Sequence, residues 1–328
     1  MSRARTFMLV VCCVAAVLVA PWIGPGMFSE WAAGAPALDL EARQFIWANL
    51  RVPRVGMGLL VGACLGATGA AYQVVFSNPL ATPSTVGTSA GATLGALGVL
   101  VLSSGGQAVG VPLLVLAAFI GAVGATAVAA AVSASGRASA EDVLLAGIAV
   151  TLATSALASG LQFQADYAET FAAVRWSLGN LAVVGAQRPL MLLPLALINL
   201  AIILWFRRSL ESLVVGPERA QTQGISVVAV RTWCLVAGAL GVGASVALCG
   251  PIAFVGLIVP HLVRRFTGAS RASIMWMSAL GGGALLVLCD AIARVAWPGR
   301  EIPVGVITAA LGAPSLLWLI VRRRRAAA

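Results

Sequence analysis

Residues 252–266 read IAFVGLIVPHLVRRF, and this short stretch determines how many times the chain can cross a membrane. Its apolar part ends at Val263, Pro260 interrupts it, and Arg264 and Arg265 follow directly. A membrane-spanning helix needs about 20 apolar residues, within a range of about 17–25. The stretch is therefore a doubtful span by itself, and the rest of the chain has to show whether it crosses.

The composition places the whole chain in a membrane. Of its 328 residues, 60% are hydrophobic and only 10% are charged, whereas a soluble domain carries about 25% charged residues. All 21 basic residues are arginine, so a P-loop, which needs its lysine, is excluded. The chain is too apolar to be disordered. It shows no basic face of a soluble domain, so the net charge of +10 does not indicate nucleic-acid binding.

The six cysteines lie in or beside apolar runs without CxxC spacing, which argues against a zinc site or a disulfide framework. We interpret them as buried free thiols, and we expect no metal site in the chain.

Ten apolar runs are candidates for membrane helices if the doubtful stretch is counted. The first resembles a signal peptide, but it lacks a convincing cleavage site and is expected to remain as a helix. The ten predicted spans are 7–24, 55–75, 86–102, 111–133, 143–163, 189–206, 228–248, 252–266, 274–296 and 304–321.

The distribution of charge favours ten spans over nine. With a cytoplasmic N-terminus, ten spans place 14 arginines and four acidic residues inside, against seven of each outside. Without the eighth span, the run from Arg322 to Arg325 would lie outside, against the positive-inside rule. Ten spans therefore predict that both termini are cytoplasmic.

Three connecting segments are long enough to carry function. The external segments are 25–54, with a short surface helix expected near 40–50, and 164–188. The internal loop 207–227 is polar and has turn signals at Gly216-Pro217 and Gly224. Its composition alone favours a plain connector, and a docking surface is the alternative.

Small residues recur at helical spacing in two of the predicted spans. Gly58, Gly62 and Gly66 repeat every four residues, as do Gly91 and Gly95. Because this spacing lets membrane helices approach closely, it predicts a compact bundle and says nothing about substrate.

The sequence GTSAG at 87–91 matches the G-x-S-x-G pattern of serine hydrolases. A nucleophile at Ser89 would need a nearby base, and the single histidine, His261, stands beside the arginines that end the eighth span. No strand-turn-helix context surrounds Ser89. We therefore favour close helix packing over a hydrolase.

Two groups of charged residues border the spans on the predicted outer side. Asp290 and Arg294 stand one helical turn apart, which favours a structural ion pair over a proton relay. Arg51 and Arg54 flank Val52-Pro53. They fit either carboxylates of a partner or arginines that snorkel at the membrane boundary.

Several segments together resemble one family, the permease subunits of FecCD-type ABC importers for iron chelates, haem and cobalamin. The resemblance covers residues 45–325, and the motifs occur in the same order and spacing. The segments that carry it are RVPR at 51–54, NPLATP at 78–83, VGTSAGA at 86–92, LLAG at 144–147, WSLG at 176–179, GPIAFVGLIVPH at 250–261, DAIAR at 290–294 and EIPVGVIT at 301–308.

The resemblance implies an all-α polytopic permease of a type II importer, with ten membrane helices that contain an inverted repeat. It implies a homodimer in the lipid of a bacterial inner membrane. Two separate ABC ATPase subunits would bind ATP and Mg²⁺, and a periplasmic or lipoprotein binding protein would deliver the substrate. The chain itself would hold no catalytic site and no cofactor. The expected cargo is an iron chelate, either a ferric siderophore or haem, with cobalamin as the alternative and a proton-coupled transporter using Asp290 as a rival of another class.

The resemblance also assigns roles to residues. Residues 207–227 become a coupling loop that contacts the ATPase, and the arginines of the outer side become contacts for the binding protein. The expected residues are, for coupling, Gly216, Pro217, Glu218, Arg219, Gln223 and Gly224; for docking, Arg51, Arg54 and Arg294; for the pathway or gate, Asn78, Pro79, Ser89, Ser139 and Glu141; and for substrate in the outer loop, Arg175.

Overall fold

The computed structural model describes residues 2–23, 39–102, 111–135, 138–182, 185–267, 273–297 and 300–327. Within these ranges the chain forms helices and no strand, which confirms the all-α prediction. A helix occupies each of the ten predicted spans, although the predicted end of the first, residue 24, lies outside the described residues. The stretch near 40–50 is also helical, but it continues without a break into the next helix as far as Val75, so it is not a separate short helix.

The helices at the ten predicted spans are α1 (Ser2–Val19), α4 (Val52–Val75), α5 (Thr88–Leu102), α6 (Val111–Ala134), α7 (Ala140–Gln164), α9 (Gln187–Trp205), α12 (Val227–Cys249), α13 (Val255–Thr267), α14 (Ser273–Val295) and α15 (Val304–Ala327). The shorter elements are η1 (Ala20–Trp22), α3 (Leu40–Ile46), the π-helical η2 (Trp47–Arg51), η3 (Pro83–Val86), α8 (Tyr167–Ser177), α10 (Arg207–Val215) and α11 (Pro217–Thr222).

Helix α13 is much shorter than a full membrane span. Its 13 residues extend for about 20 Å, against about 30 Å of hydrocarbon. The predicted start at residue 252 is wrong, because the backbone turns at Gly250 and Phe254, which both have positive φ, and the helix begins only at Val255. Among the described residues, seven other segments are long and apolar enough to cross a membrane. Helix α5 and the segment Val304–Leu317 of α15 are shorter apolar helices.

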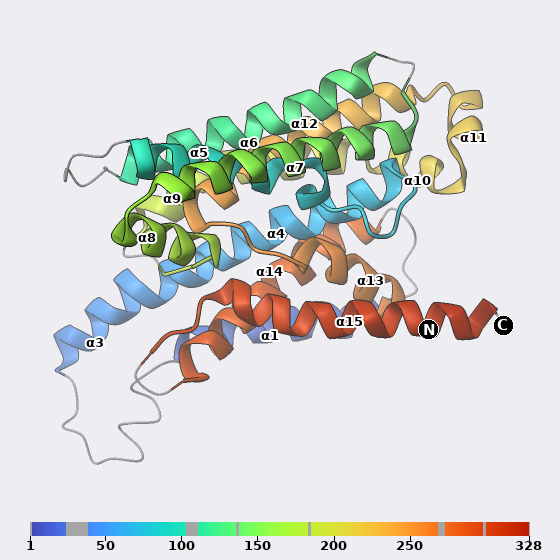
Figure 1. The fold of residues 1–328 in the computed structure, drawn as a ribbon. Helices are drawn as coiled ribbons and strands as arrows, with labels where there is room; N and C mark the ends of the chain where they lie inside the picture. Colours follow the sequence, from blue (N-terminus) through green and yellow to red (C-terminus); the bar gives the residue numbers. More distant parts are fainter. Residues whose placement is uncertain are drawn as a thin grey trace.

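Figure 1 shows how the helices are arranged. The N-terminal end of α1 and the C-terminal end of α15 lie at the same end of the bundle as α10 and α11, whereas α3 and α8 lie at the opposite end. A chain that crosses the membrane an even number of times has both of its ends on the same side. The arrangement therefore agrees with the ten-span topology, while the side of the membrane that each end faces stays a prediction.

The closest helix packing occurs where the glycine repeats predicted it. A Cβ atom at Gly62 would overlap with the carbonyl oxygen of Gly282 in α14, and one at Gly66 would overlap with that of Ser278. Gly91 and Gly95 of α5 make the same kind of backbone contact with α6. Because the absence of side chains allows this approach, the prediction of a compact bundle is confirmed.

Buried hydrogen bonds add specificity to this packing. The Asn199 side chain of α9 donates to the Thr68 hydroxyl of α4 at 2.9 Å and to the carbonyl oxygen of Ala237 in α12 at 2.8 Å. One amide thus joins three helices where water is scarce, and it sets their relative register.

Candidate functional site

The predicted coupling loop folds into two short helices joined by glycine. Gly216, with a φ of 141°, lets the chain turn from α10 into α11, which begins at Pro217. At the other end, Gly224 has a φ of 77°, and the Ile225 N–H donates to the carbonyl oxygen of Ala220. This is the hydrogen-bond pattern of a glycine-terminated helix. The turn signals in the sequence therefore mark the true boundaries of the segment.

Apolar side chains hold these two helices on the bundle, and polar side chains face away from it. Leu210 and Leu213 of α10 and Ala220 of α11 are buried, whereas Glu218 and Arg219 are exposed. The segment is thus a fixed surface that presents charge, which is more than a plain connector needs.

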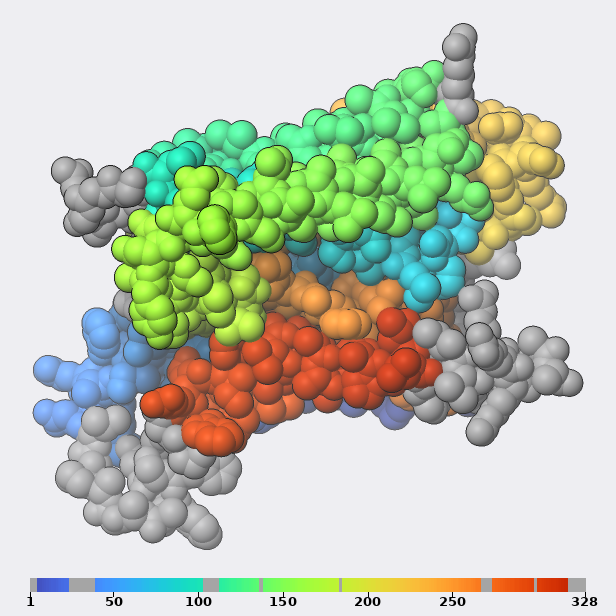
Figure 2. Space-filling view, viewed as in Figure 1, coloured from blue at the N-terminus to red at the C-terminus, as the bar shows by residue number. Residues whose placement is uncertain are grey.

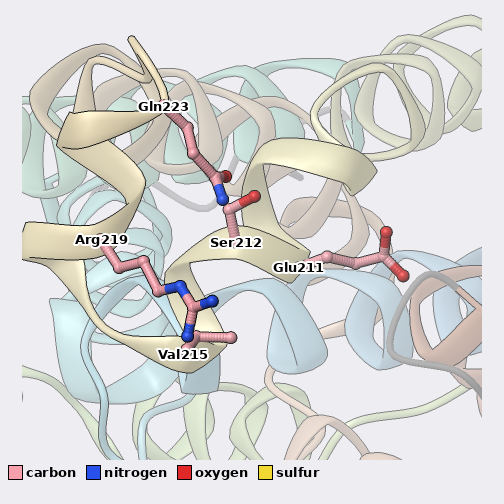
Figure 3. Close-up of a pocket in the computed structure, with 5 residues that line it drawn as sticks. All are labelled: Glu211, Ser212, Val215, Arg219 and Gln223. Atoms are coloured by element: carbon pink, nitrogen blue, oxygen red, sulfur yellow. The ribbon is translucent and has the colours of Figure 1, made fainter.

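Between the two helices lies a cavity of about 340 Å³. Figure 3 shows the Gln223 amide pointing toward Ser212, the Arg219 guanidinium beside Val215, and the Glu211 carboxylate extending away from the other four. The lining residues are Glu211, Ser212, Val215, Arg219 and Gln223. Its mixed polar and charged lining suits a segment of another protein better than an apolar ligand.

At the opposite end of the bundle, two predicted docking arginines meet one carboxylate. The Arg54 Nε donates to both carboxylate oxygens of Asp290, at 2.9 and 3.0 Å, and its Nη1 donates to Glu301 at 2.8 Å. The Arg294 Nε lies 3.2 Å from the second oxygen of Asp290. The predicted ion pair between Asp290 and Arg294 is confirmed, and Arg54 joins it from α4.

The same network reaches the end of α1. The Arg294 Nη2 donates to the carbonyl oxygen of Ala20 at 3.0 Å, and the Arg51 Nη1 donates to that of Pro21 at 3.2 Å. Both carbonyls belong to η1, so arginines from two other segments hold the turn that follows α1. This role is structural and was not apparent from the sequence.

The burial of these arginines gives two of them a structural role, while docking of a partner stays a prediction. The side chains of Arg54 and Arg294 are only 10% and 4% exposed. They are committed to Asp290, since a buried guanidinium without a carboxylate would be costly. Arg51 is half-buried and carries no carboxylate among its described contacts. It is the member of the three that remains accessible.

The predicted pathway residues Asn78 and Pro79 lie in the turn that follows α4. The side-chain oxygen of Asn78 accepts the N–H of Leu80 at 2.9 Å, next to Ser77, which has a positive φ of 48°. An asparagine that bonds to the backbone two residues on stabilises a turn. The structure thus gives these residues a part in ending α4, and a role in the pathway stays a prediction.

Ser89 occupies the second position of α5, directly after the turn at Gly87. A nucleophile elbow needs a strand before the serine, and the described residues contain none. The structure therefore agrees with the packing interpretation of this motif.

The predicted gate residues Ser139 and Glu141 lie at the start of α7. Ser139 is the N-cap residue: its hydroxyl accepts the N–H of Asp142, whose carboxylate accepts the N–H of Ser139. Glu141 is exposed. The Arg231 Nη1 of α12 donates to the carbonyl oxygen of Ala138 at 3.1 Å and fixes this turn. The side chain of Ser139 therefore has a capping role, and a gate here stays a prediction.

Arg175 is exposed on α8, and its guanidinium carbon lies 6.0 Å from the ring centroid of Phe171. Figure 2 shows a hollow between the green helices α7 and α8 and the red helix α15. The orange segment near residue 250 forms the floor of this hollow. Arg175 thus belongs to a helix that borders this hollow. Contact with a substrate stays a prediction.

The sequence motifs predict no role for Glu301 or Gln73. Glu301 begins the EIPVGVIT motif at 301–308, but its partner Arg54 is 247 positions away. Gln73 is buried in α4 and bonds to the backbone of α13. A glutamine within a predicted span is a signal of internal pairing, although only the fold identifies the partner.

Comparison with known proteins gives consistent results over the whole chain. A sequence model described as the FecCD transport family matches residues 7–322. The chain is 33% identical to the Fe(3+) dicitrate transport system permease protein FecD of Escherichia coli, over 94% of this chain and 92% of that one. It is 35% identical to the hemin transport system permease protein HmuU of Yersinia pestis, over 87% and 85%.

Further similarities extend to another substrate and to a solved structure. The chain is 36% identical to the cobalamin import system permease protein BtuC of Halobacterium salinarum, over 92% of this chain and 79% of that one. A solved structure described as an inward-facing conformation of a metal-chelate type ABC transporter superposes with a TM-score of 0.82 at 25% identity, covering 98% and 99% of the two chains.

Proposed function

The chain belongs to the FecCD transport family, and from this premise we propose that it is the permease subunit of a binding-protein-dependent ABC importer that carries a metal chelate into the cytoplasm. The observation that carries the proposal is the family match over residues 7–322. The chain also has a charged surface on α10 and α11 to which a separate motor subunit can bind. ATP and Mg²⁺ would be bound by that partner.

We propose an iron chelate as the cargo, either a ferric siderophore or haem, with cobalamin as the alternative. The similar permeases are named for ferric dicitrate, hemin and cobalamin, which are all metal chelates. Their identities to this chain differ by only a few per cent, so they support the chelate class more strongly than one member of it.

The proposal can be tested by reconstitution with an ATPase subunit and a binding protein in liposomes. Uptake of a radiolabelled iron chelate should require both partners and ATP. Cobalamin supplied to the same liposomes distinguishes the two cargoes. Uptake that is driven by a proton gradient, needs no ATP and is abolished by Asp290→Asn would overturn the proposal in favour of a secondary transporter.

We assign the contact with the ATPase to the surface of α10 and α11. Glu218 and Arg219 are exposed there, and Arg219 lines the cavity between the helices. Reversing both charges, Glu218→Arg with Arg219→Glu, should uncouple ATP hydrolysis from uptake without unfolding the chain. Charge reversal at Arg5, which is exposed on α1 outside both assigned contact surfaces, serves as the control. Unchanged coupling in the α10–α11 variant would exclude this surface.

We assign docking of the binding protein to the end of the bundle that carries α3 and α8, with Arg51 as the accessible contact. A charged residue at the rim of an interface contributes more to the rate and register of association than to affinity. Arg51→Glu should therefore slow association, and more strongly at low salt than at high salt. If the association rate does not change, Arg51 has no part in docking.

A homodimer in a bacterial inner membrane completes the proposal, with both termini in the cytoplasm. The hollow bordered by α7, α8 and α15 is the face that a second copy would cover to enclose a pathway (Figure 2). Helices α7 and α15 both carry exposed apolar side chains, such as Leu152 and Leu311, that suit lipid or a second copy. Cross-linking between α15 helices of two copies tests this arrangement.

A further inference from the structure

Helix α13 contains a carbonyl group that has lost its helical donor. In an α-helix the N–H of residue 260 would donate to the carbonyl oxygen of residue 256. Residue 260 is proline, which has no N–H. Gly256 and Pro260 are both buried, so water cannot readily replace the missing donor.

A side chain from another helix supplies the donor. The Gln73 Nε2 of α4 donates to the carbonyl oxygen of Gly256 at 3.4 Å and to that of Leu257 at 3.3 Å. Gln73 is 183 positions away from Gly256 and only 5% exposed. The amide therefore spans the point where the helical hydrogen bonds of α13 are interrupted.

The other end of the same amide is held from beyond the proline. The Arg264 Nη2 donates to the Gln73 Oε1. Arg264 lies one turn after Pro260, in the part of α13 that leads to residue 267. A single amide group thus binds both sides of the proline, with its nitrogen on the N-terminal part of α13 and its oxygen on the C-terminal part.

The two parts of α13 differ in how firmly the rest of the fold holds them. In the N-terminal part, Gly256 packs backbone to backbone against Gly69 of α4, where a Cβ atom would overlap with the Gly256 carbonyl. Phe254, just before the helix, fills the space beside Gly312 of α15. In the C-terminal part, the buried Val263 side chain faces Gly281 of α14, whereas Leu262 and Phe266 are exposed. The N-terminal part is therefore anchored through its backbone and the C-terminal part through side chains, so movement about the proline would displace the C-terminal part.

We propose that Gln73 is a positioning residue for transport, which latches a hinge at Pro260 by holding the Gly256 carbonyl and Arg264 together. When the latch is closed, the angle between the two parts of α13 is fixed. When Gln73 releases the carbonyl, the C-terminal part can change its angle to α4. The transport role rests on the proposed function, whereas the hydrogen-bond exchange does not.

A double-mutant cycle tests the exchange directly. Gln73→Leu should lower the midpoint of thermal unfolding by about 2–4 °C, because a buried carbonyl loses its donor. Pro260→Ala restores an N–H to the helix, so Gln73→Leu should lower the midpoint less in that background, where the Gly256 carbonyl keeps a donor and the bond to Arg264 is still lost. Equal shifts in both backgrounds would show that Gln73 does not replace the donor that Pro260 lacks.

Hydrogen exchange of the amides in α13 measures local opening at the hinge without an attached probe. Exchange in residues 261–266 should become faster in Gln73→Leu and slower in Pro260→Ala. Gln73→Glu keeps an acceptor for Arg264 but loses the donor to the carbonyls, so it should accelerate exchange as the leucine variant does. Exchange that is the same in all variants would overturn the hinge.

Measurements of uptake distinguish a Gln73 contact that opens during transport from one that only stabilises the fold. Pro260→Ala should reduce ATP-driven uptake by about tenfold, the rate factor that corresponds to one net hydrogen bond, although the variant is more stable than the native chain. Pro194→Ala in α9 is the matched control, because it removes another proline from inside a helix. Full uptake by the Pro260→Ala variant would show that Gln73 only stabilises the fold and would overturn its role in transport.

Failure of the latch and failure of the proposed function have different signatures. If the chain is no importer, the native protein shows no ATP-driven uptake, while the unfolding and exchange measurements can still report the latch. If the latch is wrong, the native protein transports and the cycle is additive.

Discussion

Two groups of arginines at opposite ends of the bundle differ in burial. At the end with α3 and α8, Arg54 and Arg294 are buried and share the Asp290 carboxylate. At the end with α10 and α11, Arg219 is exposed beside a cavity, and no ion pair involves it among the described contacts. The same residue type thus stabilises the fold in one group and is available to a partner in the other.

The difference shows that burial, and not the presence of charge, separates arginines held inside the fold from those that are available to a partner. A buried ion pair contributes little net free energy, but removing one member leaves the other charge uncompensated. An exposed charge costs little to keep or to lose, because water solvates it in either case. Substitutions at the two ends should therefore differ greatly in their effect on stability.

The largest expected effect is at Asp290. Asp290→Ala leaves two buried guanidinium groups without their carboxylate and should lower the free energy of unfolding by about 3–5 kcal/mol. Denaturant unfolding in detergent micelles measures the change. Glu41→Ala, at an exposed acidic residue, is the control and should be nearly neutral. If both variants unfold at the same denaturant concentration, Asp290 is not the centre of the network.

The next effect is at Ser139, on the α7 cap that Arg231 of α12 holds through the Ala138 carbonyl. Ser139→Ala removes the N-cap and should lower the free energy of unfolding by about 1 kcal/mol. Ser159→Ala on the exposed face of the same helix should have little effect, because that hydroxyl bonds only to the preceding turn. A loss of uptake well beyond the loss of folded protein would favour the gate prediction instead.

Glu301 tests how far the buried network extends. Its side chain is 43% exposed, although it accepts from the same arginine as Asp290. Glu301→Gln should therefore lower the free energy of unfolding by only about 0.2–1 kcal/mol, as for a surface ion pair. The same denaturant titration applies. A cost as large as that of Asp290→Ala would mean that the two carboxylates are equivalent.

The smallest effect on stability is expected at Arg219. Arg219→Gln should change the free energy of unfolding by no more than about 0.5 kcal/mol, because the side chain is exposed. Coupling of ATP hydrolysis to uptake should nevertheless weaken. A strongly destabilised Arg219 variant would remove the contrast between the two ends.

Much of the architecture could be predicted from local patterns. Apolar runs of membrane length located the helices, and the charge distribution required the doubtful stretch at 252–266 to be counted. Glycine repeats predicted where α4 and α5 pack closely, and turn signals at Gly216 and Gly224 marked the α10–α11 segment. Each of these signals lies within one helix or one turn, so it can be seen without knowing the partner.

The sites were predicted less completely, and the reason is the same in each case. The docking interpretation grouped Arg51, Arg54 and Arg294 by charge and by family resemblance. The structure separates them by burial, which depends on helices far apart in the sequence. Similarly, the proline in α13 was visible as an irregularity, but its donor in α4 was not.

The sequence by itself determined the membrane class and the family, because hydrophobic length and ordered motifs are properties of the chain alone. Only the tertiary structure decided which charged and polar groups meet. Asp290 pairs with Arg54, which is 236 positions away, and Gln73 bonds to Gly256, which is 183 positions away. Hydrogen bonds and ion pairs act over about 3 Å, and only the folded bundle brings groups so distant in the chain within that range.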